Sequence, residues 1–284
     1  MKNFIVPIDF SNDSLAGLDM AVMFSKKKEI NIQMVYVLTR STYYQPGTVE
    51  EEYRFAEKNF KKMIQEVEPK LGNNSRIRYI IKKGKVYREV VNQVNSYSNA
   101  VVSASTHGAS GFEELFGGSN ALKIMASTSQ PVITIKQGPV PENITKIVLP
   151  VKLHVDTRQK VPMAASLAQL FGAEIHVITI STSEGKRDLD RLRTYSRQVE
   201  GYLKSKNIPF TTKTLLGDSL PSLTINYAEA IEAELIVIMS SQIDKWNVFL
   251  GSFAQQMLNR SMVPLLSIKP KEKHIPTGFS TFGE

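Results

Sequence analysis

The sequence predicts an α/β protein of two similar domains, each a doubly wound parallel sheet covered by helices. Two observations carry this expectation: apolar strand-like runs alternate with helical patterns, and the same landmarks recur along the chain at one spacing. The recurring landmarks are Gly84 and Gly217, Pro131 and Pro264, and Gly118-Ser119 and Gly251-Ser252, each pair 133 residues apart. A spacing shared by three landmarks indicates an internal duplication.

Within the first half, strands and helices are expected in strict alternation. The expected strands are 4–9, 32–37, 76–82, 100–104 and 131–136. The expected helices follow the cap cluster Ser11–Ser14 and span 50–67, 86–96 and 117–128. The second half repeats this order. Continuous apolar strands indicate parallel sheets buried on both faces, so a ligand is expected at the carboxyl ends of the strands, where the strand order reverses.

Chain-breaking residues suggest where the domains end. The segment 137–143 contains two prolines and one glycine, and predicts a seam between domains at 1–140 and 144–270. The tail 271–284 has no periodicity and is expected to be an extended arm that Phe279 and Phe282 could anchor.

Composition excludes several classes of function. The chain of 284 residues has no cysteine, which excludes disulfides, zinc–thiolate sites and thiol catalysis. Its net charge of +8 is divided as +5 in residues 1–140 and +3 in 141–284, which disfavours a nucleic-acid partner. Because no apolar run is long enough to span a membrane and no signal sequence is evident, we expect a soluble cytoplasmic protein.

A glycine-rich loop follows the fourth strand of the first half and suggests phosphate binding. Gly118-Ser119 lies where a helix is expected to begin, and free N–H groups there favour an anion. Ser105 and Ser119 offer hydroxyl donors. Without a Gly-Lys-Ser/Thr sequence the loop is not of the Walker type, and a bare turn is the alternative.

On these residues the chain resembles a tandem universal stress protein across residues 1–269. The family motif is Gly-x2-Gly-x9-Gly-Ser/Thr; Gly108 and Gly118-Ser119 match its later elements, and Ser105 replaces its first glycine. The resemblance implies a Rossmann-like fold of the adenine-nucleotide alpha-hydrolase type. It also implies ATP or another adenine nucleotide, with or without Mg²⁺, in the first domain. The implied nucleotide-binding residues are Pro7, Asp9, Val37, Ser105, Gly108, Gly118, Ser119 and Asn120, with Asp9 near the ribose and base and the Val37 backbone at adenine.

The second half departs from this pattern. Lys152 replaces Asp9, and bulky Ile243 and Trp246 occupy the loop before Gly251-Ser252. Aligning Val237 with Val102 makes that loop two residues shorter, 14 positions against 16. We expect this domain to be empty of nucleotide because close phosphate approach needs small residues. Alternatively, Lys152 serves a different anionic ligand.

No residue is predicted to be catalytic and none to bind a metal. Asp9 could equally be a structural carboxylate at a helix N-terminus. His107 is expected to be a locally bonded loop residue rather than a base, and Glu113 and Glu114 a solvated loop rather than a magnesium site. Trp246 is expected to pack or to form a contact surface. The other histidines, which show no metal spacing, are His154, His176 and His274.

Nucleotide binding or sensing in a stress response is therefore the leading hypothesis. The rivals are a slow ATP hydrolase or phosphotransferase using Asp9 or Ser119, and a ligand-free interaction scaffold. The stretch Asp9-Phe10-Ser11-Asn12 lacks the Ser-Gly-Gly loop of nucleotide-transferring relatives, which disfavours the enzyme. Family members typically dimerise through the final strand. Here Thr134 and Ser267 alternate with apolar neighbours, and we expect an internal pseudo-dimer, with further homodimerisation as an option.

Overall fold

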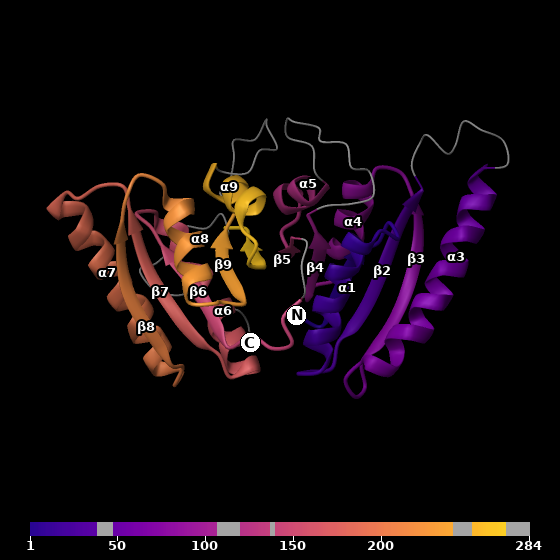
Figure 1. The fold of residues 1–284 in the computed structure, drawn as a ribbon, viewed down its shortest axis with the longest axis horizontal. Coiled ribbons are helices and arrows are strands. Elements are labelled where there is room, and N and C mark those ends of the chain that lie inside the picture. Colours follow the sequence, from indigo (N-terminus) through magenta and orange to yellow (C-terminus); the bar gives the residue numbers. More distant parts are fainter. Residues whose placement is uncertain (39–47, 107–119, 137–139, 241–251, 271–284) are drawn as a thin grey trace. The chain divides into compact units, whose positions relative to one another are not determined.

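The chain folds into two compact units, the first covering Met1–Pro141 and the second beginning at Glu142 (Figure 1). The computed structural model describes residues 1–38, 48–106, 120–136, 140–240 and 252–270. Both units are α/β, with parallel strands and helices in alternation, which confirms the fold class expected from the sequence.

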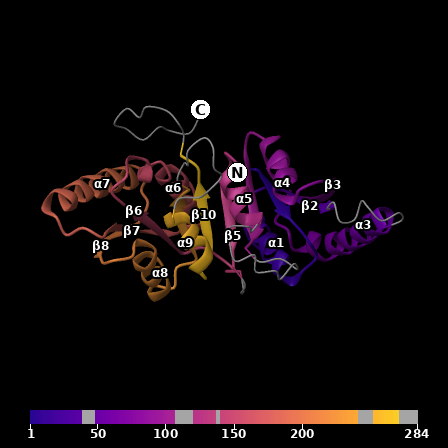
Figure 2. The same ribbon diagram turned by 90° about the horizontal axis from the view of Figure 1, so that it is seen from above.

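Unit 1 is a parallel sheet with the strand order β3-β2-β1-β4-β5. Its elements are β1 (Asn3–Pro7), α1 (Asn12–Ser25), β2 (Asn31–Leu38), α3 (Thr48–Val67), the 3-10 turn η1 (Glu68–Lys70), β3 (Arg76–Lys83), α4 (Val86–Asn95), β4 (Ala100–Ser105), α5 (Asn120–Ser127) and β5 (Val132–Ile135). Helices α1 and α3 cover one face of this sheet, and α4 and α5 cover the other (Figure 2). Because both faces are covered, the central strand β1 buries Phe4, Ile5 and Val6 completely.

The expected strands and helices of this half match the structure to within about two residues, the usual uncertainty of an element boundary. Strand β1 ends at Pro7, not at residue 9, although the Ile8 N–H still donates to the Val35 carbonyl at 2.9 Å. The first three residues of the expected helix 117–128 lie outside the described residues.

Helix α1 packs unusually closely on β4, and Gly17 is the reason. A Cβ atom on Gly17 would lie 2.6 Å from the carbonyl oxygen of Ser103. The buried Ser103 hydroxyl donates to the Gly17 carbonyl at 2.8 Å, which fixes the two backbones against each other. Glycine is thus required here by close approach of the backbones.

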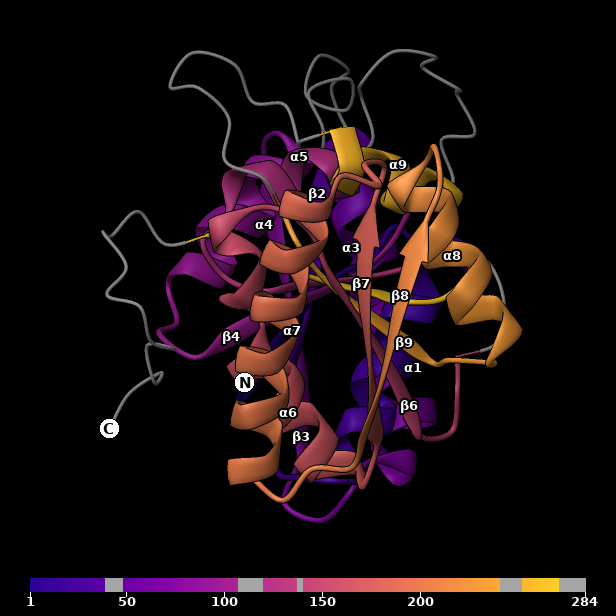
Figure 3. The same cartoon turned by 90° about the vertical axis from the view of Figure 1, so that its left-hand side faces the viewer.

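Unit 2 has the equivalent strand order, β8-β7-β6-β9-β10, and is also parallel. Its elements are β6 (Lys146–Val151), the 3-10 turn η2 (Val155–Arg158), α6 (Val161–Phe171), β7 (Glu174–Ser181), α7 (Lys186–Ser205), β8 (Phe210–Leu216), α8 (Leu220–Ala230), β9 (Leu235–Met239), α9 (Ser252–Arg260) and β10 (Leu265–Ile268). Figure 3 looks onto the β8 side, where α7 runs alongside β7 and β8.

The long helices α3 and α7 are amphipathic, as their sequence patterns predict. Helix α3 buries Ala56 and Phe60, and α7 buries Leu192, Val199 and Leu203, while the opposite faces are charged. Among the helices that the structure describes, none combines the length and the apolar character needed to cross a membrane.

Backbone details repeat between the units. Gly84 and Gly217 both have positive φ, +144° and +159°. The Gly84 N–H donates to the Leu38 carbonyl at 3.0 Å, and the Gly217 N–H donates to the Ser181 carbonyl at 3.2 Å. The same turn therefore follows the third strand of each unit, and its glycine N–H bonds to the last residue of the second strand.

The strand register corrects one comparison between the two halves. In unit 1 Val102 pairs with Val132, the first residue of β5, whereas in unit 2 Ile236 pairs with Leu265, the first residue of β10. Ile236, not Val237, is therefore the counterpart of Val102. Counted from these partners, 15 positions separate Ile236 from Gly251, against 16 from Val102 to Gly118. The loop of unit 2 is therefore one residue shorter than that of unit 1, and the expected difference of two residues was wrong.

Substituting Gly17 by alanine is expected to destabilise unit 1 by about 1–3 kcal/mol, the usual cost of overpacking. The added methyl group would collide with the Ser103 carbonyl. Gly201→Ala on α7 is the matched control, because nothing lies within 4 Å of its Cβ position. That variant is expected to gain roughly 0.5–1 kcal/mol through helix propensity. Urea unfolding followed by circular dichroism measures both, and equal effects at the two positions would contradict the close-packing argument.

Candidate functional site

Strand order in unit 1 reverses beside β1, which makes one edge of the sheet a natural ligand site. From β1 the chain passes through α1 to β2 on one side, and β4 lies on the other side of β1. Pro7 ends β1, Ser105 ends β4, and Val37 is the penultimate residue of β2. The structure thus brings three predicted residues to the same carboxyl edge.

Asp9 lies just beyond β1 at this edge and organises the start of α1. Its Oδ1 accepts hydrogen bonds from the Ser11 N–H at 3.0 Å and from the Ser11 hydroxyl at 2.5 Å. Ser11 Oγ in turn accepts from the Ser14 N–H at 3.2 Å and caps the helix. The structural role of Asp9 is therefore real, while its side chain is also exposed at the predicted ligand edge.

Phe10 joins Asp9 to Ser11 with a left-handed backbone, φ +64°, which is rare for a bulky residue. Its ring lies 5.0 Å from the rings of Tyr36 and Phe60 and 5.7 Å from that of Phe55. These three aromatic contacts hold the side chain against β2 and α3 and so stabilise the turn that presents Asp9.

Tyr36 connects this aromatic cluster to the charge of Asp9. Its hydroxyl donates to Glu52 Oε1 at 2.6 Å. Burial raises the pKa of Tyr36 most, and the hydrogen bond and charge of Glu52, then the charge of Asp9, raise it further. Sequence reasoning did not single out Phe10, Tyr36 or Glu52 as neighbours of the site; only the adjacency of Phe10 to Asp9 pointed to them.

The remaining predicted residues divide between described and undescribed parts of the chain. Val37 is buried and pairs with Lys82 of β3, Ser105 is half-buried, and Asn120 is exposed at the first described position of α5. Residues that lie outside the described ones are Gly108, Gly118, Ser119, His107, Glu113, Glu114 and Trp246.

At the equivalent edge of unit 2, Lys152 follows β6 directly. Its backbone N–H donates to the Thr157 hydroxyl at 3.3 Å, and its ammonium lies 4.5 Å from the ring centroid of Phe253 at the start of α9. Burial lowers the pKa of Lys152. A cation therefore stands where unit 1 has the Asp9 carboxylate.

Lys160 is a buried lysine that sequence reasoning missed. Its side chain is 1% exposed, and its ammonium donates to the Thr157 carbonyl at 2.5 Å and to the Thr157 hydroxyl at 3.2 Å. Burial, and secondarily the charge of Lys152, holds the pKa of Lys160 well below 10.5. Because β1 aligns with β6 and β2 with β7 at one spacing, Lys160 is the counterpart of Gly17.

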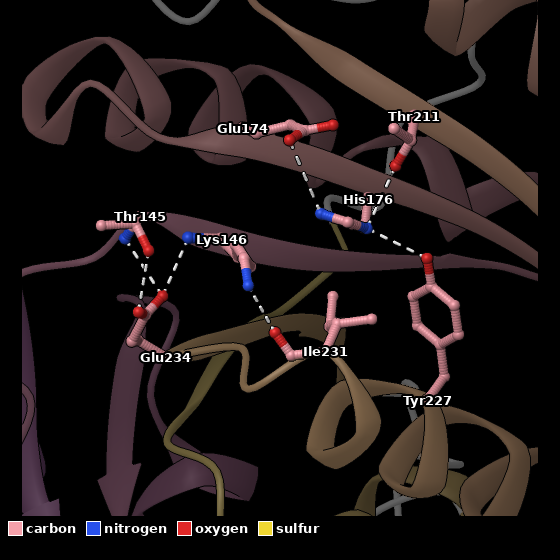
Figure 4. A network of polar contacts seen from close by, with 8 residues as sticks. All are labelled: Thr145, Lys146, Glu174, His176, Thr211, Tyr227, Ile231 and Glu234. Carbon is pink, nitrogen blue, oxygen red and sulfur yellow. Dashed lines mark hydrogen bonds and ion pairs between the residues drawn. The ribbon is translucent and has the colours of Figure 1, made fainter.

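The half-buried His176 belongs to a structural network at the opposite end of the unit 2 sheet (Figure 4). His176 Nδ1 lies 3.0 Å from the hydroxyls of both Tyr227 and Thr211, and Nε2 lies 3.8 Å from Glu174. Glu174 and Thr211 stand near the amino ends of β7 and β8. Burial lowers the pKa of His176, the charge of Glu174 opposing this. No cluster of three metal-binding side chains occurs among the described residues.

A sequence model of the universal stress protein family matches residues 1–136 and again residues 143–269. This chain belongs to the universal stress protein family. The double match agrees with the resemblance and with the duplication found in the sequence. No protein of curated function matches this chain.

Solved structures support the fold of this universal stress protein. A universal stress protein from Archaeoglobus fulgidus DSM 4304 is 20% identical, with a TM-score of 0.77, over 95% of this chain and 97% of that one. A putative universal stress protein from Pseudomonas aeruginosa UCBPP-PA14 is 14% identical, with a TM-score of 0.67, over 95% and 94% of the two chains. At these identities the likeness establishes the shared fold.

Lys160→Met is expected to stabilise unit 2 at neutral pH and to reduce the dependence of its stability on pH. Between the lowered pKa of folded Lys160 and 10.5 the unfolded chain binds more protons, so the stability of the natural protein rises with pH across this window. Methionine removes this proton linkage. Melting temperatures measured from pH 6 to 10 test the prediction, with the exposed Lys58→Met on α3 as control. An unchanged slope for Lys160→Met would contradict it.

Proposed function

We propose that this universal stress protein binds an adenine nucleotide at the carboxyl edge of the unit 1 sheet and acts as a nucleotide-dependent regulator in a stress response. The observation that carries the proposal is the meeting of Pro7, Val37 and Ser105 at the reversal of strand order, with the Asp9 carboxylate just beyond. Open α/β sheets bind ligands at this place.

Each side of this edge suits a different part of a nucleotide. The Asp9 carboxylate is an acceptor for ribose hydroxyls, and the end of β2 at Val37 offers backbone groups to adenine. The phosphates are assigned to Gly108, Gly118 and Ser119, before Asn120 of α5, because free N–H groups at a helix N-terminus favour anions. Mg²⁺ is compatible with this arrangement and is not required by it.

Binding is favoured over hydrolysis because the Asp9 carboxylate already takes part in the start of α1. One of its oxygens accepts two hydrogen bonds from Ser11, which caps that helix. Hence we assign Asp9 to ligand contact and helix capping and leave ATP hydrolysis as the rival reaction.

Unit 2 is proposed not to bind the same ligand. Lys152 stands at the position of Asp9, and an ammonium group cannot accept a hydrogen bond from a ribose hydroxyl. Its ammonium is also held against Phe253. We assign to this unit a role in assembly.

Purified protein is expected to bind ATP or AMP in calorimetric titration. Gly118→Val is expected to weaken this binding at least about tenfold, a loss of ~1.4 kcal/mol of binding free energy, because the valine side chain blocks the approach of the phosphates. Asp9→Asn weakens binding less, because the amide still accepts one hydrogen bond from Ser11 and one from ribose. Mass spectrometry of the supernatant after denaturation identifies any nucleotide that co-purifies.

The matched control is Gly251→Val, the same change at the equivalent position of unit 2. It is expected to leave nucleotide affinity unchanged. Equal affinity of Gly118→Val and natural protein would exclude the assigned loop. No binding with or without Mg²⁺ would favour a ligand-free scaffold, whereas phosphate release sensitive to Asp9→Ala would favour the hydrolase.

We further propose that the two units associate as an internal pseudo-dimer through β5 and β10. Each is the last strand in the order of its own unit and therefore has one row of backbone groups for a further strand. Thr134 of β5 has a hydroxyl that is buried and finds no hydrogen-bond partner within the described part of the chain.

Single cysteines introduced pairwise along β5 and β10, in a chain with no natural cysteine, are expected to form intramolecular disulfides on mild oxidation. Mass spectrometry after proteolysis identifies the linked peptides. Pairs placed on β3 and β8 serve as controls. Exclusive formation of intermolecular disulfides, or none, would contradict internal pairing.

A further inference from the structure

Two lysines lie at the carboxyl edge of the unit 2 sheet, and no described carboxylate compensates their charge. Lys152 is half-buried and Lys160 is 1% exposed. Among the described side chains, the charge that acts on Lys160 is that of Lys152, and no carboxylate forms an ion pair with either lysine. An unpaired buried ammonium is costly, and a second one beside it raises the cost.

Thr157 joins the two lysines into one local structure. Its hydroxyl accepts hydrogen bonds from the Lys152 backbone at 3.3 Å and from the Lys160 ammonium at 3.2 Å. The carbonyl of Thr157 accepts a second hydrogen bond from Lys160. These contacts satisfy hydrogen-bonding groups but supply no negative charge.

The position of this pair in the fold is that of a ligand site. Lys152 directly follows β6, where the strand order of unit 2 reverses between β6 and β9. Its ammonium lies over Phe253, the second residue of α9, so the positive charge is held at the N-terminal turn of a nine-residue helix. The helix dipole adds positive potential at the same place.

We propose that unit 2 binds a small phosphate-class oxyanion, either free phosphate or a phosphate monoester, through Lys152 and Lys160. The anion supplies the missing negative charge beside the two lysine side chains. The inference is independent of nucleotide binding by unit 1, because it rests on side chains that unit 1 lacks: Asp9 and Gly17 stand at the equivalent positions.

Stabilisation by inorganic phosphate or methyl phosphate tests the proposal in full-length protein carrying Gly118→Val, which removes the loop assigned to unit 1. Melting temperature is followed at constant ionic strength, with sodium chloride as the reference salt. Phosphate is expected to raise it, and Lys152→Met or Lys160→Met is expected to weaken the apparent affinity at least about tenfold. Lys58→Met makes the same charge change on α3 and is expected to behave like its parent.

Sulfate provides a second probe, since it is a divalent tetrahedral oxyanion that does not titrate near neutral pH. Its affinity, measured by calorimetry, is expected to fall at least about tenfold in Lys160→Met. A greater effect of methyl phosphate identifies an ester, and a greater effect of inorganic phosphate identifies the free ion.

Three results would overturn the inference. They are the absence of stabilisation by either probe, equal affinity of Lys160→Met and its parent for phosphate, and equal affinity of the two proteins for sulfate. Circular dichroism of both lysine variants checks that they are folded, and Lys152→Gln provides a second, polar replacement. Failure here would leave nucleotide binding by unit 1 intact, and failure of the nucleotide test would leave this site intact.

Discussion

Burial of parallel strands on both faces is the constraint from which the rest of this protein follows. A strand such as β1, with Phe4, Ile5 and Val6 fully buried, needs helices on either side of the sheet. Connections through those helices run every strand in the same direction, and so all carboxyl ends meet at one edge. Because these ends are where the backbone leaves the sheet, polar residues can be placed there without disturbing the core.

Duplication has kept this backbone and changed the chemistry at its edge. The turns at Gly84 and Gly217 are alike, down to the hydrogen bond that each donates. Yet the equivalent position just beyond the first strand holds Asp9 in unit 1 and Lys152 in unit 2, a reversal of charge that needs no change in the strands. A carboxylate suits hydroxyl donors, an ammonium suits anions, and the two copies can therefore serve different ligands.

Sequence reasoning found the fold because its landmarks are physically marked. Glycines with positive φ and prolines before the last strands keep their spacing, and buried strands read as apolar runs. The sequence could not show that Ile236, and not Val237, is the counterpart of Val102. Every residue of Leu235–Met239 is apolar and buried, so alignments of β9 that differ by one residue look alike. Lys160 was missed for the opposite reason: lysines are almost always exposed, and its burial arises from tertiary packing.

The contrast between Gly17 and Lys160 shows that the carboxyl edges of the two sheets differ because the first helices of the two units, α1 and α6, start differently. In unit 1 helix α1 approaches β4 so closely that a Cβ atom would collide with Ser103, and no side chain can enter. In unit 2 the same position carries Lys160. There the segment after β6 first forms the 3-10 turn η2, and α6 starts only at Val161. Thr157 of that turn is what bonds Lys160 and Lys152. The later start of α6 thus allows a lysine to be buried at this edge. An anion bound there would pair with the positive charge of that lysine.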